Sequence, residues 1–375
     1  MRHGELTEQR WKRYRTTIRN DRNFPQVDFL EGVLPGAGQE QVNAMTISSH
    51  PEAELPPPSA SAPLSRRRLG PRLPRRRADA DTAAAYAFLA PAILGFGVFV
   101  VFPLIRSGYF ALTRYNGLTP PRFVGFDNFR QMFETDPSFW PSVRATVELV
   151  VLYVPLSLVL GLALAVFCNQ RLRGVRLVRT LCYLPVVLPV VATITLWKFV
   201  FDPQVGLANQ VLRWLHLPTG MWLSSSSTAM PSIVIVMLWS VGSTMIIFLA
   251  ALQAVPTELY EAARIDGAGN AAVFFRITLP LISPIMLLQV VLQLTTALQT
   301  FNQPKILSAG GSGGPGFSTD TLMLSVYNHG FPTLGGEPRL GYASAQTWVL
   351  FLAIVVVVAA TARFSSIWTF HDQHS

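Results

Sequence analysis

Residues 258–284 read ELYEAARIDGAGNAAVFFRITLPLISP and lie between two long apolar runs. Thr257, just before them, is a suitable cap for a new helix. Glu258 and Glu261 would fall in the first turn of that helix, where the helix dipole favours acidic side chains. Gly267 suits the left-handed turn that often ends a helix. The pattern predicts a short helix, a glycine break and a second amphipathic helix that leads into the next apolar run.

One side of the first predicted helix carries Leu259, Ala262, Ala263 and Asp266 at helical spacing. Alanine side chains are small enough to let the backbone of another protein come close, and an adjacent acid supplies a fixed charged contact. This face therefore predicts a docking surface for a partner protein. The alternative is an ordinary amphipathic linker that ends in a capped turn and docks nothing.

Six apolar runs surround this segment, and each is long enough to cross about 30 Å of hydrocarbon as a helix. They cover residues 83–112, 143–168, 178–201, 232–252, 279–300 and 342–362. Only 14% of the 375 residues are charged, whereas soluble domains carry about 25%. Because unpaired backbone groups are costly in lipid, these runs are expected to be helical. The sequence predicts an all-α membrane protein with six transmembrane helices.

Residues 1–80 contrast with the rest of the chain, because they are polar and rich in proline, serine and arginine. Such a segment buries too little apolar surface to offset its ordering entropy, so we expect a disordered cytoplasmic tail. A start site assigned too far upstream would also explain part of it. The tail ends in arginines that would contact anionic lipid and hold the first helix cytoplasm-in. These are Arg66, Arg67, Arg68, Arg72, Arg75, Arg76 and Arg77.

The loop between the second and third runs holds Arg171, Arg173, Arg176 and Arg179. Short basic loops next to membrane helices tend to stay in the cytoplasm. This cluster predicts that both chain termini and residues 258–284 are cytoplasmic. The formal net charge of +9 would also suit nucleic-acid binding, but the basic residues are not interleaved with aromatic residues in a recognisable module.

Catalytic and metal-binding patterns are missing from the sequence. It contains no G-x-x-x-x-G-K-[ST] phosphate loop, so we expect no ATP hydrolysis and no cofactor in this chain. The histidines show no metal-ligand spacing, so no metal residues are assigned. The chain is therefore expected not to be an enzyme.

A polar stripe runs along the fifth apolar run at steps of four and three residues, which places its members on one side of a helix. It consists of Gln289, Gln293, Thr296, Thr300 and Gln303. Amides and hydroxyls within a bilayer suit a pathway for a neutral sugar with many hydroxyl groups. They also suit hydrogen bonds between packed helices, and both interpretations remain open.

The stretch EAARIDGAGNAAVFFRITLPLISP resembles the EAA loop of permease subunits of bacterial ABC importers, in particular the maltose and glycerol-3-phosphate permease branch. Further stretches agree with that branch over residues 83–370. They are FVGFDNFRQMF (123–133), LCYLPVVLP (181–189), LWKFVFDPQVGLANQVL (196–212) and GYASAQTWVLF (341–351). The resemblance implies the type I importer fold over residues 81–370, with a cytoplasmic coupling loop at 256–280.

The same resemblance implies partners and roles. Residues that would couple to the ATPase are Glu261, Ala262, Ala263, Asp266 and Gly267. We expect a second permease, as a heterodimer, two cytoplasmic ATPase subunits that bind ATP and Mg²⁺, and an extracytoplasmic solute-binding protein. The chain would lie in the bacterial plasma membrane and carry a sugar or a similar solute.

Two rival functions remain. A secondary transporter driven by an ion gradient would need intramembrane acids, and only Glu148 lies within a predicted span. A membrane enzyme or a scaffold that recruits a cytoplasmic partner through residues 258–284 is the other alternative. Dependence of uptake on a separate ATPase distinguishes these functions.

Overall fold

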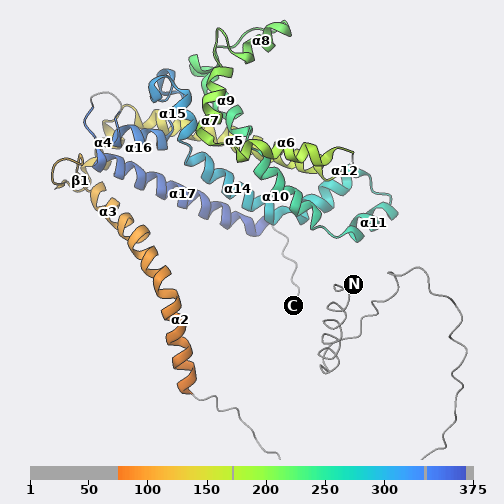
Figure 1. Cartoon of the computed structure of the whole chain (residues 1–375), viewed down its shortest axis with the longest axis horizontal. Helices are drawn as coiled ribbons and strands as arrows, with labels where there is room; N and C mark the ends of the chain where they lie inside the picture. The colour runs from red at the N-terminus through yellow and green to blue at the C-terminus, as the bar shows by residue number, and fades with distance from the viewer. Residues whose placement is uncertain (1–74, 171–172, 333–335, 369–375) are drawn as a thin grey trace, which may run out of the picture. The chain divides into compact units, whose positions relative to one another are not determined.

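The computed structural model describes residues 75–170, 173–332 and 336–368, and helices dominate this part of the chain (Figure 1). The predicted disordered tail therefore lies almost wholly outside the described residues. The first half of the described chain contains α2 (Arg75–Phe96), η1 (Gly97–Val101), α3 (Phe102–Ala111), β1 (Thr113–Arg114), β2 (Arg122–Phe123), α4 (Asp127–Glu134), α5 (Phe139–Cys168), α6 (Val175–Val187), α7 (Val190–Val200), α8 (Leu207–Trp214) and η2 (Trp222–Ser224).

The second half begins with α9 (Ser226–Leu238) and α10 (Gly242–Gln253). It continues with α11 (Thr257–Ile265), α12 (Asn270–Val273), η3 (Phe274–Thr278), α13 (Leu279–Leu281), α14 (Ser283–Leu298), α15 (Asn302–Leu307), η4 (Ala309–Gly311), η5 (Pro315–Phe317), α16 (Leu322–Gly330) and α17 (Leu340–Trp368). β1 and β2 form one short antiparallel pair in which Thr113 lies opposite Phe123.

Four of the six predicted spans are single long apolar stretches of helix within the described residues. They cover Ala85–Ala111, Phe139–Cys168, Ser283–Leu307 and Leu340–Arg363. The third and fourth spans are each two helices, with a bend of 101° between α6 and α7 and of 51° between α9 and α10. The expectation of six apolar spans is met if each bent pair counts as one span, but these two are not the single helices that the sequence predicted.

A proline explains the first bend, and a glycine allows close packing at the second. Leu188 is extended and Pro189 follows it without a backbone donor, so the hydrogen-bond ladder stops between α6 and α7. At the second bend, a Cβ atom on Gly242 would lie 2.1 Å from the carbonyl oxygen of Cys182. Only a glycine lets the start of α10 approach α6 this closely.

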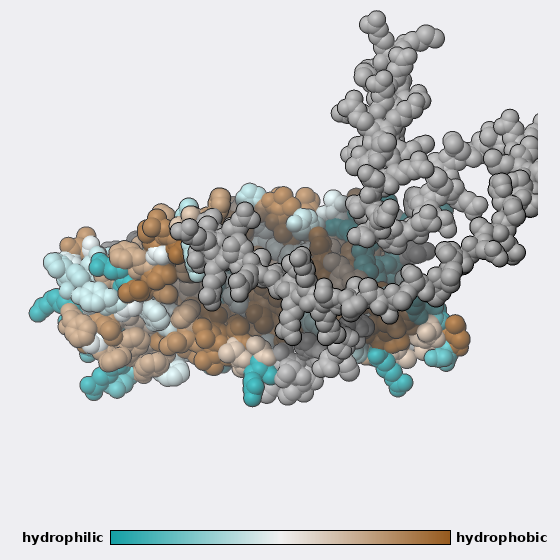
Figure 2. Space-filling model, turned by 90° about the horizontal axis from the view of Figure 1, so that it is seen from below, coloured by the Kyte–Doolittle hydropathy of each residue, from teal (hydrophilic) through white to brown (hydrophobic). Residues whose placement is uncertain are grey.

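The core of the bundle forms around α5, which packs against α9, α10 and α14. Gly161 on α5 allows close contact with α10, because a Cβ there would lie 2.6 Å from Cγ2 of Thr244. Many apolar side chains remain exposed in the chain alone, among them Phe88 at 87% and Phe99 at 81%. Brown apolar side chains cover much of the face in Figure 2, as expected for a surface that lies against lipid or another membrane subunit.

The long helices α5, α14 and α17 connect two different ends of the bundle (Figure 1). We call the end that carries α11 and α12 the loop end. The opposite end carries the β1–β2 pair, α4 and α16.

Candidate functional site

The predicted coupling loop forms a helix, a glycine turn and a second short helix, as the sequence indicated. α11 begins at Thr257, and Pro256 occupies the N-cap position. Thr257 is therefore the first helical residue and not the cap that the sequence predicted. Gly267 has φ +77°, and the amide of Ala268 donates to the carbonyl of Ala263 at 2.9 Å. This is the left-handed helix end that was expected at Gly267.

The predicted docking residues of α11 do not share one surface. Glu261, Ala262 and Asp266 are exposed, whereas Ala263 is 7% exposed. Gly267 is also exposed and has no atom within 4 Å of its ideal Cβ position. Ala263 therefore packs α11 against the bundle, and the open face of the helix is carried by the other residues.

Two contacts hold the loop to the membrane helices. Tyr260 packs against the core cluster that includes Leu252 and Ile282, and its hydroxyl lies 3.2 Å from Oγ1 of Thr278. Helical backbone then runs from α12 through η3 and α13, with a turn at Ile282, into α14. A displacement of α11 would therefore reach α14 through both the side chains and the chain itself.

One exposed residue of the loop was not singled out from the sequence. Ile265 is 86% exposed and follows Glu261 by four residues and Ala262 by three, so it extends their open face. The signal in the sequence that could have identified Ile265 is its apolar side chain within a short polar helix. A single exposed apolar side chain is common on protein surfaces, so Ile265 extends the open face of α11 without identifying what covers it.

Buried hydrogen bonds occupy the middle of the predicted polar stripe. Gln289 is 1% and Gln293 8% exposed. Gln293 accepts from the Tyr153 hydroxyl at 2.9 Å and donates to Oγ1 of Thr244 at 2.8 Å, which joins α14 to α5 and α10. Gln293 also approaches Oε1 of Gln289 at 3.4 Å, and Nε2 of Gln289 is buried without a partner among the described residues.

The remaining stripe residues lie in other environments. Thr296 is exposed and donates to the Leu292 carbonyl of its own helix at 2.9 Å. Thr300 is buried and donates to the Thr296 carbonyl at 2.8 Å. α14 ends at Leu298, so the half-buried Gln303 belongs to α15. The stripe therefore extends over two helices and only its first two residues form one cluster.

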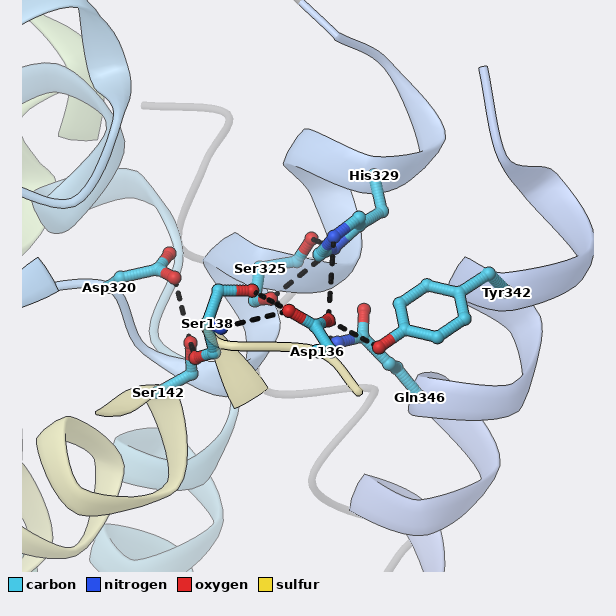
Figure 3. A network of polar contacts seen from close by, with 8 residues as sticks. All are labelled: Asp136, Ser138, Ser142, Asp320, Ser325, His329, Tyr342 and Gln346. Atoms are coloured by element: carbon cyan, nitrogen blue, oxygen red, sulfur yellow. Dashed lines mark hydrogen bonds and ion pairs between the residues drawn. The ribbon is translucent and has the colours of Figure 1, made fainter. Parts of the chain in front are cut away.

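A second polar cluster lies at the end opposite the loop, and the sequence did not indicate it (Figure 3). Asp136 precedes α5 and accepts hydrogen bonds from Ser138 and from the hydroxyl of Tyr342 on α17. His329 on α16 places Nε2 3.7 Å from Oδ2 of Asp136. Nearby, Ser142 on α5 donates to Oδ2 of Asp320 at 2.7 Å. These contacts tie α16 and the segment before it to α5 and α17.

The ionisable groups of this cluster are shifted in different directions. Burial, together with the charge of Asp136, raises the pKa of Asp320 to about 6, against the opposing hydrogen bond from Ser142. Burial acts the same way on Asp136, but hydrogen bonds from Tyr342 and Ser138 outweigh it and lower its pKa. Burial lowers the pKa of His329, against the opposing effects of the Ser325 carbonyl and the charge of Asp136.

The glycine-rich segment before α16 has a defined path. A Cβ atom on Gly313 would lie 2.4 Å from Cβ of Asp320, and Gly313 has φ +90°. Its carbonyl accepts from the amide of Thr319 at 2.7 Å. Glycine at this position therefore brings the segment against Asp320. Within the described ranges, no three His, Cys, Asp or Glu side chains gather in a way that would hold a metal ion.

Comparison with known proteins places this geometry in a family. The family model described as "Binding-protein-dependent transport system inner membrane component" matches residues 157–369, which include the whole loop, the polar stripe and all of α17. A solved structure also matches, that of a bacterial ABC transporter involved in the import of the acidic polysaccharide alginate. Its TM-score is 0.69 at 25% identity, and the match covers 79% of this chain and 100% of that one.

Curated relatives agree with the family model. The "Probable ABC transporter permease protein YesP" of Bacillus subtilis is 35% identical over 294 residues, which are 78% of this chain and 93% of the relative. The "Sulfoquinovosyl glycerol transport system permease protein SmoG" of Agrobacterium fabrum is 34% identical over 287 residues, or 76% and 90% of the two chains. These relatives are named as transport permeases and not as enzymes. The chain therefore belongs to the family of binding-protein-dependent transport system inner membrane components, the permeases of ABC importers.

Proposed function

We propose that this chain is a permease subunit of an ATP-driven ABC importer for a carbohydrate or a similar polyhydroxy solute. The observation that carries this proposal is the short helix α11, which presents Glu261, Ala262 and Asp266 outward from one end of a bundle of membrane helices. A permease of this family needs a surface of this kind if ATP is hydrolysed by a separate chain.

The proposed coupling begins when two ATPase subunits bind ATP and Mg²⁺ and close. One ATPase would hold the open face of α11 through Ala262 and its acidic neighbours. Ala263 and Tyr260 fix the other face to the bundle, so movement of the ATPase would displace α14 and α10 together with α11. The permease would thereby switch between inward- and outward-facing states.

A second permease is part of the proposal. The most apolar part of the span Ala85–Ala111 has none of its residues buried inside this chain. A helix with that composition lies against lipid or another membrane subunit. A similar permease, as a heterodimer, would cover part of this surface and would supply the second coupling loop. An extracytoplasmic solute-binding protein would deliver the solute, in keeping with the description of the family.

The solute pathway is proposed along the stripe that contains Gln289, Gln293, Thr296, Thr300 and Gln303. The unpartnered Nε2 of Gln289 supports this assignment, because a buried amide donor gains most from an added acceptor. Neutral amides and hydroxyls match the hydroxyl groups of a sugar. The names of SmoG and of the alginate importer refer to sugar-containing solutes, which supports the same class here.

The proposed orientation puts the loop end and both chain termini in the cytoplasm of a bacterium. It rests on Arg173, Arg176 and Arg179, which lie at the start of the third span, on or just before α6. The ion-gradient transporter remains the alternative function. No observation on the described residues favours it, since Glu148 is exposed on α5 and faces no second acid at hydrogen-bonding distance.

The test is purification of the full chain from its native membranes through a tag at the carboxyl terminus. Mass spectrometry should find an ATPase chain with a phosphate loop and a second permease. Uptake in cells should fail when ATP is depleted and persist when the proton gradient is collapsed. Purification of the chain alone, with uptake that follows the ion gradient, would instead establish the secondary transporter.

A further inference from the structure

Two neighbouring cavities open at the loop end, and they share Asn169 and Gln170 at the end of α5. One has a volume of about 340 Å³ and reaches Tyr260, Arg264 and Asn270 of the loop, with Thr278 behind them. The other has a volume of about 660 Å³ and lies at the start of α6. Both volumes fall within the range of about 300–1,000 Å³ that small-molecule sites occupy. We call the two together the joined cavity.

The lining of the joined cavity mixes apolar and polar side chains, and its charged members are all arginines. Arg264 faces one part, and Arg176 and Arg179 face the other. The side-chain amides of Asn169, Gln170, Gln253 and Asn270 complete the polar lining. Of the residues that the structure describes, no aspartate or glutamate lines either part.

These arginines differ from others in the described part of the chain. Arg130 pairs with Glu134 at 2.8 Å and Arg114 with Asp127 at 3.4 Å, both in exposed positions. By contrast, no carboxylate within the described ranges lies within 4 Å of the guanidinium groups of Arg176, Arg179 or Arg264. Arg176 and Arg179 line the same part of the joined cavity, so their like charges repel one another, and an anion would relieve that repulsion.

Arg179 is held in place with a donor left unused. Its Nη2 donates to the carbonyl of Cys168 at 2.6 Å, which fixes the guanidinium at the end of α5. Its Nε is buried and has no partner among the described residues. A buried donor without an acceptor is costly, and an anionic oxygen would form a strong charge-assisted hydrogen bond with it.

The first turn of α6 adds to this environment. Gly174 has φ +88° and precedes the helix, and Val175 and Arg176 of the first turn line the cavity. The positive end of a helix dipole favours an anion near these residues. The arginines and the helix therefore favour the same sign of charge.

We propose that the joined cavity binds a phosphate-bearing anion, which bridges the ends of α5, α6 and α10 to the coupling loop. Arg176 and Arg179 would hold the phosphate oxygens, and Arg264 would contact the same group from the loop. The inference rests on the proposed function, which places this end in the cytoplasm and gives α11 its coupling role. An anion held there would restrain α11 and make coupling depend on its occupancy.

Two sources can supply such a group, namely an anionic phospholipid of the adjoining leaflet and a free phosphate compound of the cytoplasm. The test uses the full importer complex in nanodiscs of phosphatidylcholine, with or without phosphatidylglycerol, and separately with inorganic phosphate added to pure phosphatidylcholine. Retained lipid is measured by native mass spectrometry, and phosphate binding by the shift of the thermal unfolding midpoint.

The double variant Arg176→Gln with Arg179→Gln should weaken binding of the preferred source at least about tenfold, because it removes two charge-assisted contacts. Arg264→Gln is a second variant with no role in the packing of α6 and should weaken binding in the same direction. Arg213→Gln on α8, an exposed arginine outside the cavity, is the matched control and should bind like the wild type.

Retention of phosphatidylglycerol that the cavity variants lose identifies the lipid as the source. A midpoint shift by inorganic phosphate that they lose identifies the free anion. Equal binding of both probes by wild type, cavity variants and control overturns the proposal, as does no binding by the wild type. The amount of ATPase chain in the same preparation is measured separately, so failure of this inference can be distinguished from failure of the proposed function.

Discussion

Gln293→Leu removes the centre of the hydrogen-bonded cluster that joins α14 to α5 and α10. The change keeps most of the side-chain volume, so its effect comes mainly from lost polar contacts. Two good hydrogen bonds disappear, from the Tyr153 hydroxyl at 2.9 Å and to Oγ1 of Thr244 at 2.8 Å. The longer approach to Gln289 at 3.4 Å contributes little.

The magnitude follows from where these contacts lie. Hydrogen bonds between membrane helices contribute about 0.6 kcal/mol on average and about 1.7 kcal/mol at most. Two of them give about 1.2 kcal/mol, and the buried hydroxyls that lose a partner add to the cost. We predict that Gln293→Leu lowers the free energy of unfolding by about 1–3 kcal/mol.

The assay is unfolding of the purified importer in mixed micelles, with a double-mutant cycle that combines Gln293→Leu and Tyr153→Phe. The cycle should give a coupling energy of about 0.6 kcal/mol or more. Thr296→Val is the matched control, because its hydroxyl bonds only to its own helix and is exposed. If the Gln293→Leu protein were as stable as the wild type and showed no coupling to Tyr153, the hydrogen bonds of Gln293 would not stabilise the bundle as described.

Uptake by the same variants separates the two interpretations of the stripe. If Gln293 contacts the solute, Gln293→Leu changes the apparent affinity for the solute beyond what lower protein abundance explains. If the side chain serves only to join helices, uptake per folded molecule stays unchanged.

Further predictions concern the bend between α9 and α10, the polar cluster that contains Asp320, and the coupling loop. Gly242→Ala should lower the free energy of unfolding by about 1–3 kcal/mol, because its Cβ would meet the Cys182 carbonyl. Gly95→Ala has open space around it and should be neutral or slightly stabilising in the same unfolding assay. The pKa of Asp320 is raised to about 6, so the folded state binds this proton more tightly than the unfolded state does. The contribution of Asp320 to stability therefore favours folding at low pH and is lost as the pH rises from about 4 to 6. Asp320→Asn should therefore flatten the pH dependence of the melting temperature in that window, and an unchanged profile would contradict the burial of this carboxyl. Glu261→Lys should leave the protein in the membrane but uncouple uptake from ATP hydrolysis, and normal uptake at normal expression would remove Glu261 from the coupling role.

Local signals in the sequence indicated much of the fold. Apolar runs and the cost of unpaired backbone in lipid predict the spans, and Gly267 predicts the left-handed end of α11. The two bends depend on more than local preference. The break between α6 and α7 lies at Pro189, whereas the approach of Gly242 to Cys182 is packing between segments far apart in the chain.

The candidate site was predicted less completely for a related reason. Helical spacing alone cannot show that Ala263 turns toward the bundle while Ala262 stays open, because the direction depends on how α11 sits against Tyr260 and its neighbours. The cluster around Asp136 was invisible in the sequence, since Ser142, His329 and Tyr342 come from separate elements. Such contacts exist only after the bundle has formed.

The most direct test of the central claim is retention of the ATPase by a loop variant. Ala262→Arg places a long charged side chain on the open face of α11, whereas Gln210→Arg places the same side chain on the exposed surface of α8. The amount of ATPase that copurifies with each tagged full-length chain is measured at matched expression. We predict that the wild type and Gln210→Arg retain the ATPase and that Ala262→Arg loses it. Equal retention by all three would contradict docking of an ATPase on α11.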